Sequence, residues 1–177
     1  MKDIPRILIY HADQCDPKKC TGIRLARMKR ATILREMRRI PRGAVILNPV
    51  SKTALSPADR PLIERFGLAA LDCSWKRAES IFAASRGGAQ RALPYLLAAN
   101  PINTYKPLKL STAEAIAAAL YITGLSETAQ DLLSVFKWGD AFFALNRELL
   151  DAYAACSTSG EVVEVQTEIM AEQTREK

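Results

Sequence analysis

The order of apolar runs along the chain is the feature that most restricts its fold. Residues 6–10, 43–48 and 68–72 are short runs rich in Ile, Leu, Val and Ala, as is typical of buried strands. Residues 56–66 lie between the second and third runs and open with an N-cap serine, a proline and an acid, which indicates a helix. Because strands that alternate with helices pair in parallel, the sequence predicts an α/β fold with a parallel sheet in its N-terminal half.

The second half of the chain is predicted to be mostly helical. Ser111 and Glu114 form a capping box that opens a helix, and Gly124 ends it. Two further helices are expected over residues 127–138 and 140–155.

We expect three segments along the chain. Residues 1–92 form the α/β domain, including a helix over residues 75–85. Residues 93–157 form a helical domain that completes a ligand pocket and opens with an apolar, proline-containing loop. This loop suits an adenine ring, unless it is only a connection between domains. Residues 158–177 contain no Phe, Leu, Trp or Tyr and are expected to form a flexible tail.

Positive charge is concentrated near the N-terminus. The 177 residues carry a formal net charge of +6, and ten of the 25 Lys and Arg residues lie between positions 18 and 42, where Glu36 is the only acid. Crowding of like charges favours an anionic partner, and nucleic-acid phosphate is the commonest one. A solvated basic face without a specific ligand is the alternative.

Several classes of protein are excluded or disfavoured. No apolar run reaches the length of a membrane span, and the N-terminus lacks the apolar core of a signal peptide, so we expect a cytoplasmic protein without a membrane partner. The four cysteines are then expected to be reduced thiols. His11, Cys15 and Cys20 have poor spacing for zinc, so no metal is expected. The sequence contains no phosphate-binding glycine loop and no nucleophile elbow.

Asp72 and Trp75 are the residues most suggestive of a site. They follow the third predicted strand, and ligands of open parallel sheets bind at the carboxyl ends of the strands. An acid there can orient a ribose or accept a proton, and an indole can face a base or a cation. The alternative is a helix cap at Asp72 or Ser74 with Trp75 in the core.

Six segments together resemble one family. The chain resembles the small-subunit rRNA aminocarboxypropyltransferases at six segments that lie in the same order. These segments are residues 15–22, 71–75, 91–101, 110–115, 136–139 and 146–150. The resemblance implies a SPOUT-like fold, with a parallel-sheet N-terminal half, a helical C-terminal half and a deep trefoil knot. It implies that S-adenosylmethionine donates its 3-amino-3-carboxypropyl group to N3 of a modified uridine or pseudouridine in small-subunit rRNA, which releases methylthioadenosine. It also implies a monomer that acts on the pre-ribosomal small subunit.

The resemblance implies specific roles for residues of this chain. Asp72 corresponds to an acid near the reacting centre, and Trp75 and Ala78 to the apolar wall around the sulfonium methyl. The other cofactor contacts that it implies are Thr21, Leu71, Leu93, Leu108 and Thr112. Residues 104–108 depart from the usual family pattern, but the contacts there are to the main chain.

The basic segment then gains a role in RNA binding. We expect its side chains to bind rRNA phosphates with an affinity that falls steeply with salt. The residues we assign to this contact are Lys18, Lys19, Arg24, Arg27, Lys29 and Arg30. Three alternatives remain open, which are an RNA methyltransferase of similar fold, a non-catalytic rRNA-binding assembly factor and, more distantly, a zinc-binding scaffold.

Overall fold

The computed structural model describes residues 4–12, 18–72, 80–81, 87–105 and 109–177. Within these residues a five-stranded sheet has the order β2-β1-β4-β3-β5, and every pair of neighbours is parallel. The expected α/β fold with a parallel sheet is therefore confirmed. The strands are β1 (Ile7–His11), β2 (Thr32–Leu34), β3 (Val45–Leu47), β4 (Leu68–Asp72) and β5 (Ala89–Arg91).

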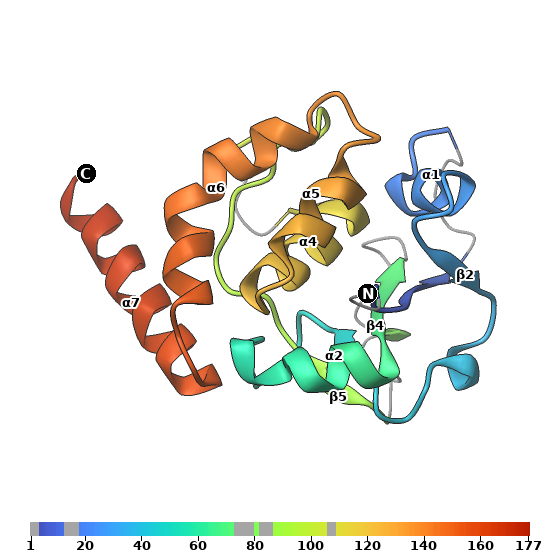
Figure 1. Ribbon diagram of the computed structural model, residues 1–177. Helices are drawn as coiled ribbons and strands as arrows, with labels where there is room; N and C mark the ends of the chain where they lie inside the picture. The colour runs from blue at the N-terminus through green and yellow to red at the C-terminus, as the bar shows by residue number, and fades with distance from the viewer. Residues whose placement is uncertain (1–3, 13–17, 73–79, 82–86, 106–108) are drawn as a thin grey trace.

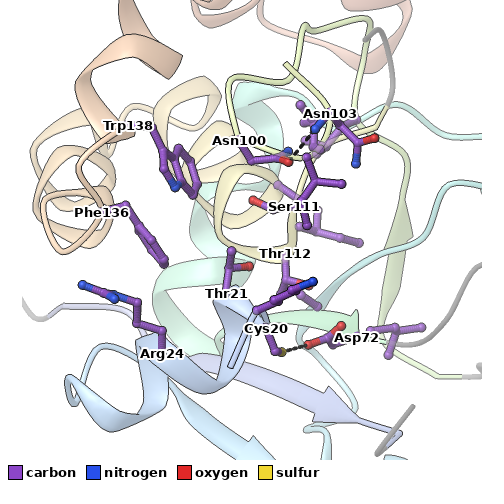
Figure 2. A pocket seen from close by; sticks show the side chains of 18 of the residues that line it. Cys20, Thr21, Arg24, Asp72, Asn100, Asn103, Ser111, Thr112, Phe136 and Trp138 are labelled. Atoms are coloured by element: carbon purple, nitrogen blue, oxygen red, sulfur yellow. Dashed lines mark hydrogen bonds between the residues drawn. The ribbon is translucent and has the colours of Figure 1, made fainter. Parts of the chain in front are cut away.

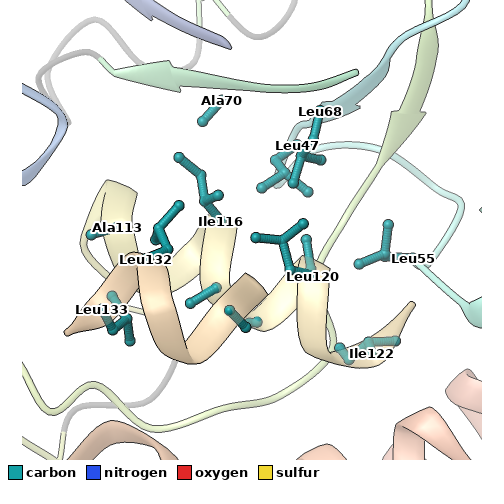
Figure 3. Packing of buried hydrophobic residues seen from close by; sticks show 14 of the residues in the cluster. Leu47, Leu55, Leu68, Ala70, Ala113, Ile116, Leu120, Ile122, Leu132 and Leu133 are labelled. Atoms are coloured by element: carbon teal, nitrogen blue, oxygen red, sulfur yellow. The ribbon is translucent and has the colours of Figure 1, made fainter. Parts of the chain in front are cut away.

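Both faces of the sheet are buried, which explains the continuous apolar runs of its central strands. Successive side chains of a strand point to opposite faces, so Leu68 and Ala70 of β4 enter one hydrophobic cluster, whereas Ala69 and Leu71 enter another. The larger cluster contains the helices of the second half. Figure 3 shows Ile116, Leu120 and Leu132 packed beneath β4.

The helices of the N-terminal half are short, and those of the second half form a layer on one side of the sheet (Figure 1). Helix α4 lies against β4, α5 packs on α4, and α7 lies beside α6. The helices are α1 (Thr21–Arg27), α2 (Arg60–Phe66), α4 (Thr112–Ile122), α5 (Ser126–Leu133), α6 (Gly139–Ala154) and α7 (Ser159–Arg175).

Two helix starts predicted from capping residues are confirmed. The Ser111 hydroxyl accepts from Glu114 N, and the Glu114 carboxylate accepts from Ser111 N, which completes a capping box at α4. Ser56 and Asp59 form the same arrangement before the 3-10 turn Pro57–Asp59 that leads into α2. The helix expected over residues 75–85 lies almost entirely outside the described residues.

The last segment differs from the expectation of a flexible tail. It forms α7, whose N-terminus is capped by Thr158, and it buries Val162 against the core. Val165 and Ile169 pack on the same cluster, so spaced β-branched residues supply the apolar face without any large aromatic side chain.

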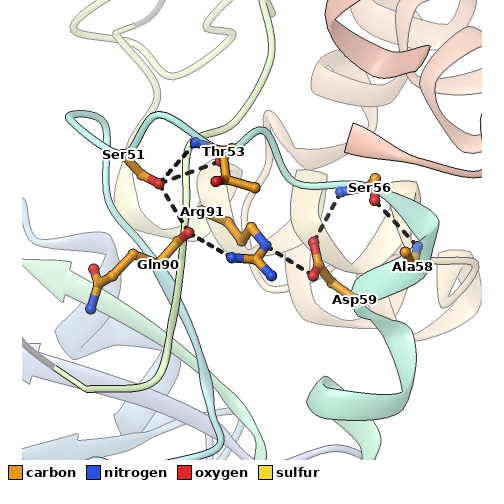
Figure 4. Close-up of polar contacts among 7 residues, drawn as sticks. All are labelled: Ser51, Thr53, Ser56, Ala58, Asp59, Gln90 and Arg91. Carbon is orange, nitrogen blue, oxygen red and sulfur yellow. Dashed lines mark hydrogen bonds and ion pairs between the residues drawn. The ribbon is translucent and has the colours of Figure 1, made fainter. Parts of the chain in front are cut away.

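β5 is held at the edge of the sheet by side chains as well as by its ladder (Figure 4). Arg91 Nε lies 2.9 Å from Asp59 Oδ1, and this carboxylate is buried at the end of the 3-10 turn before α2. Ser51 Oγ donates to Gln90 O at 2.9 Å. These bonds connect β5 to the stretch of chain between β3 and α2, which explains how a polar three-residue strand holds its place.

The helices of the described segments include none whose length and apolarity would suffice to span a bilayer.

Candidate functional site

The carboxyl ends of β1 and β4 define a ligand-binding position. These strands are neighbours, and their last residues, His11 and Asp72, are partners in the ladder. The strand that follows β1 in the chain, β2, lies on one side of the β1–β4 pair. The strand that follows β4, β5, lies on the other side. A reversal of this kind opens a crevice at the ends of the two strands.

A cavity of about 870 Å³ lies at this edge of the sheet. Both halves of the chain contribute to its wall, since Leu71 and Asp72 come from β4 and Thr112 and Ala115 from α4. Figure 2 shows Asp72 and Thr112 on the wall of this pocket. The volume falls in the range of small-molecule sites.

The loop before α4 is fixed by a buried carboxylate. Glu114 is fully buried, and its Oε1 accepts from Ala99 N at 2.6 Å and from Asn100 N at 3.0 Å. Its Oε2 accepts from Asn100 Nδ2 and from Ser111 N, each at 2.7 Å. One side chain thus connects the loop to the N-terminus of α4, where both line the cavity.

Helices α6 and α7 hold the preceding part of the loop. Asn146 is buried and pairs with the backbone of Leu97 in both directions, each bond being 2.8 Å. Tyr153 donates to Tyr95 O at 2.9 Å, and Gln166 of α7 accepts from Tyr95 N at 2.8 Å. Side chains thus satisfy backbone N–H and C=O groups of the loop that a neighbouring strand would pair with in a sheet.

Asp72 is held on one side by the N-terminal half. Cys20 Sγ donates to Asp72 Oδ2 at 2.9 Å, and His11 Nε2 lies 4.0 Å from the same oxygen. A Cβ on Gly22 would lie only 2.9 Å from Oδ2, so a glycine in α1 permits this close approach. The Asp72 side chain keeps 12% of its surface exposed and lines the cavity.

Among the described residues, one group has ligand atoms close enough to hold a metal ion. Its members are His11, Cys20 and Asp72, whose ligand atoms all lie within 4.8 Å of one another. Cys15, which the sequence placed with His11 and Cys20 as a candidate zinc ligand, lies outside the described residues. The contact of 2.9 Å between Cys20 and Asp72 is a hydrogen bond, which a neutral thiol makes without any metal.

An aromatic pair forms another part of the wall. Phe136 and Trp138 are half-buried between α5 and α6 and line the cavity, with ring centroids 4.8 Å apart and planes inclined by 30°. Arg24 of α1 donates to Val135 O through Nε and Nη2, at 3.2 and 2.8 Å, and its guanidinium lies 5.5 Å from the Phe136 centroid. In Figure 2 this pair and Asp72 lie on opposite sides of the pocket, with Thr21 and Thr112 between them.

The structure divides the predicted RNA-binding residues into two groups. Lys18, Lys19, Arg24 and Arg27 contribute to the wall of the cavity and make its rim basic. Lys29 and Arg30 instead lie beside a smaller hollow, where Arg30 forms an ion pair of 2.6 Å with Asp131 of α5.

The residues predicted as cofactor contacts lie together wherever the structure describes them. Thr21, Leu71, Leu93 and Thr112 line the cavity, as does Asp72. Thr21 Oγ1 also accepts from Ala113 N at 3.1 Å, which connects α1 to the start of α4. Trp75, Ala78 and Leu108 lie outside the described residues.

Sequence reasoning did not assign Phe136, Trp138 or Cys20 to the site. The signal for the aromatic pair was present, since two aromatic residues flank Lys137 at the end of a predicted helix of a basic protein. Nothing local indicated that Cys20 contacts Asp72, because the two residues lie 52 positions apart.

The fold and site define a class of protein. It is a parallel α/β protein with a small-molecule cavity at the switch point of its sheet, closed by helices of the second half and surrounded by basic side chains. A family model described as "Ribosome biogenesis protein, C-terminal" matches residues 45–170. A second model, described as "Possible Fer4-like domain in RNase L inhibitor, RLI", matches residues 5–38, a stretch that contains only Cys15 and Cys20, whereas an iron–sulfur cluster of that kind is bound by four cysteines.

Curated relatives are similar over nearly their whole length. The 16S rRNA aminocarboxypropyltransferase of Methanocaldococcus jannaschii is 48% identical over 170 residues, which cover 96% of this chain and 99% of that protein. The protein of the same name from Methanothermobacter thermautotrophicus is 52% identical over 164 residues, covering 91% and 96%. A solved structure, the SAM-dependent rRNA:acp-transferase Tsr3 from Vulcanisaeta distributa, matches with a TM-score of 0.85 and 43% identity, covering 90% of this chain and 88% of that one. This chain belongs to the 16S rRNA aminocarboxypropyltransferase family, as the resemblance in its sequence predicted.

Proposed function

We propose that this protein transfers the 3-amino-3-carboxypropyl group of S-adenosylmethionine to small-subunit rRNA and releases methylthioadenosine. The observation that carries the proposal is the cavity itself. It joins the switch point of the sheet to the start of α4, and the described residues that correspond to the family's cofactor contacts all line it. The names of the relatives, which cover nearly the whole chain, support the same activity.

The residues present fit the cofactor. Apolar side chains from both halves, including Leu47, Pro49 and Leu93, line the part of the cavity that suits an adenine ring. The Thr21 hydroxyl and the start of α4 at Thr112 suit the amino-acid end, because the first N–H groups of a helix favour a carboxylate. We assign Trp75 and Ala78 to the sulfonium methyl and Leu108 to the adenine ring on the resemblance alone.

The cofactor supplies three electrophilic carbons on one sulfonium sulfur. Selection among them is a question of orientation, because only a carbon aligned with the nucleophile reacts. A wall of Trp75 and Ala78 around the methyl would direct the three-carbon chain toward the RNA. An indole face near the positive sulfur would contribute about 0.5–2 kcal/mol.

We propose that N3 of a modified uridine or pseudouridine is the nucleophile and that Asp72 orients or deprotonates that base. The carboxylate lies at the edge of the cavity, and the Cys20 thiol already binds its Oδ2. Alignment of the base with the reacting carbon supplies most of the rate.

Three finer proposals rest on family membership. The chain is proposed to form a deep trefoil knot around the cofactor, as in the SPOUT methyltransferases, and the all-parallel sheet with a site at its carboxyl edge is compatible with that topology. It is proposed to act as a monomer on the pre-ribosomal small subunit in the cytoplasm. The division into an α/β domain over residues 1–92 and a helical domain from residue 93 is also a proposal; one continuous hydrophobic cluster joins the two parts.

Product analysis tests the proposed activity. S-adenosylmethionine labelled on its carboxyl carbon, or in parallel on its methyl carbon, is incubated with the protein and with small ribosomal subunits from cells that lack it. We expect label in the rRNA only from the carboxyl-labelled donor, together with methylthioadenosine. Subunits that already carry the modification serve as the control and should incorporate nothing.

Two results would contradict the proposal in different ways. Methyl label in the RNA together with S-adenosylhomocysteine would identify a methyltransferase of similar fold. RNA binding without any affinity for S-adenosylmethionine would identify a non-catalytic assembly factor.

A further inference from the structure

We propose that Phe136 and Trp138 form a stacking platform for an unpaired base of the RNA substrate, beside the end of the cofactor site. The inference rests on the proposed function and adds the surface on which the acceptor strand is held. The cofactor contacts proposed above do not include these two residues.

The two rings have the position and exposure of a binding surface. Both line the cavity, and both stay partly exposed, although each also packs against the hydrophobic core at its edge. Phe142 and Tyr153, by contrast, have no exposed surface. A pair of partly exposed rings that stack on each other beside a cavity suits a planar ligand.

The platform is held rigid by its neighbours. Two N–H groups of Arg24 donate to Val135 O, directly before Phe136, and the guanidinium lies against the Phe136 ring. Gly139 follows Trp138, and a Cβ there would lie 2.2 Å from Leu133 O, so the chain can turn into α6 only with a glycine. A rigid surface of this kind loses little conformational entropy when a ligand stacks on it.

The position of the platform favours the acceptor over the donor. The apolar contacts suited to adenine lie near β3 and the loop that begins at Leu93, whereas Thr21 and Thr112 lie between Asp72 and the aromatic pair in Figure 2. A donor whose amino-acid end lies at Thr21 and Thr112 would present its three-carbon chain toward the space in front of the platform. A base stacked there would lie between the platform and Asp72.

The charge around the platform favours RNA over another planar ligand. Lys18, Lys19 and Arg27 line the same cavity, and Lys137 separates the two rings in the sequence. Aromatic faces combined with basic side chains are the combination that binds unpaired nucleotides, because the rings stack on bases and the cations bind phosphates. An enzyme that modifies N3 must also take the base out of its pair, since N3 is occupied in a Watson–Crick pair.

Leucine variants test the platform because they keep apolar bulk and remove the aromatic face. For Phe136→Leu and Trp138→Leu we expect unchanged affinity for S-adenosylmethionine by calorimetry. We also expect a fall of roughly tenfold in kcat/KM for unmodified small ribosomal subunits at saturating donor, as expected for one lost base–aromatic stack. Phe136→Tyr and Trp138→Phe keep a ring and should retain most of the transfer.

A direct binding measurement complements the kinetics. The chain has two tryptophans, so Trp75→Phe leaves Trp138 as the only indole. Without cofactor, we expect a single-stranded oligouridylate to quench the fluorescence of Trp138 in this variant. Phe66→Leu, at the end of α2 and away from the cavity wall, is the matched control for loss of an aromatic ring and should transfer normally.

The outcomes separate this inference from the proposed function. Leucine variants with normal kcat/KM for RNA, or Trp138 fluorescence that does not respond to RNA, would overturn the platform while transfer by the unaltered protein stands. Loss of donor affinity equal to the loss of transfer would assign the rings to the cofactor instead. Absence of aminocarboxypropyl transfer by the unaltered protein would refute the proposed function itself.

Discussion

Glu114 and Asp72 are the two carboxylates that shape the cavity, and their surroundings differ. Glu114 is fully buried, and backbone or amide N–H groups bind both of its oxygens, so its role is to hold the loop and α4 together. Asp72 receives a bond from Cys20 at one oxygen and is partly exposed to the cavity. The surroundings of Glu114 suit a structural role, and those of Asp72 suit contact with a ligand.

Replacement of Glu114 by glutamine tests the structural role. One oxygen becomes an NH₂ group that faces N–H donors, so we expect a loss of about 1–3 kcal/mol in the free energy of unfolding. We also expect weaker binding of S-adenosylmethionine, because the loop that lines the cavity loses its anchor. Urea unfolding and calorimetry measure the two effects. Glu148→Gln on the exposed face of α6 is the control, and equal stability of both variants would contradict the assignment.

Variants of Asp72 and Cys20 test the proposed chemistry. We expect Asp72→Ala to lower the turnover number at saturating donor, and an unchanged value would refute a role for this carboxylate. Cys20→Ala leaves Asp72 Oδ2 without its thiol donor and should lower turnover about fivefold, which corresponds to one hydrogen bond of about 1 kcal/mol. Cys20→Ser restores a donor and should recover activity, whereas a purely space-filling role would make serine and alanine equivalent.

At the level of elements, helices α6 and α7 act as a scaffold for a loop that has no regular structure of its own. Asn146, Tyr153 and Gln166 each bind a backbone group of that loop, at Leu97 or Tyr95. Gln166 also lines the cavity, so the last helix of the chain contributes to the site. The segment that its composition predicted to be a flexible tail is therefore part of the pocket wall.

The Tyr153 hydroxyl gives this scaffold a dependence on pH. Burial raises its pKa well above the ordinary value of 10.0. The unfolded chain loses this proton near pH 10 while the folded chain keeps it, so the stabilisation is complete below pH 10 and declines as the pH rises further. We expect the free energy of unfolding of Tyr153→Phe to decline less steeply above pH 10 than that of the unaltered protein.

The same variant loses its bond to Tyr95 O, which should cost about 1 kcal/mol below pH 10. Urea unfolding over a series of alkaline pH values measures both effects. Tyr105→Phe removes a hydroxyl from an exposed tyrosine and should follow the unaltered protein throughout. Identical pH profiles for the Tyr153 variant and the unaltered protein would contradict the assignment.

At the scale of the whole molecule, the distribution of charge matters more than its sum. The net charge is +6, but the basic side chains that line the cavity come from the region around α1. The five acids after residue 160 belong to α7 and the residue that caps its end, on the far side of α6 (Figure 1). This asymmetry would orient an approaching polyanion toward the cavity.

Salt dependence tests this orientation. We expect the logarithm of RNA affinity to fall linearly with the logarithm of salt concentration, and Lys19→Gln and Arg27→Gln each to reduce the slope by about 0.7–0.9. Arg65→Gln on α2, away from the cavity, is the matched control and should leave the slope unchanged. Affinity that does not respond to salt would exclude phosphate contacts as the basis of binding.

Elements whose signals are local could be predicted from the amino-acid sequence. Strands β1, β3 and β4 are apolar because both of their faces are buried, and α2 and α4 begin at capping residues that any chain would use in the same way. The basic segment and the family blocks also indicated an RNA-modifying transferase, because each of these signals consists of consecutive residues.

Only the tertiary structure decided the edges of the sheet, the last helix and the site. β2 and β5 are three residues long, too short for a hydrophobic pattern to indicate a strand, and exist because a neighbouring strand pairs with them. Cys20 meets Asp72, and Glu114 meets Ala99, through contacts between residues far apart in the chain. Such contacts depend on the distance between elements after packing, and local propensity carries no information about that distance.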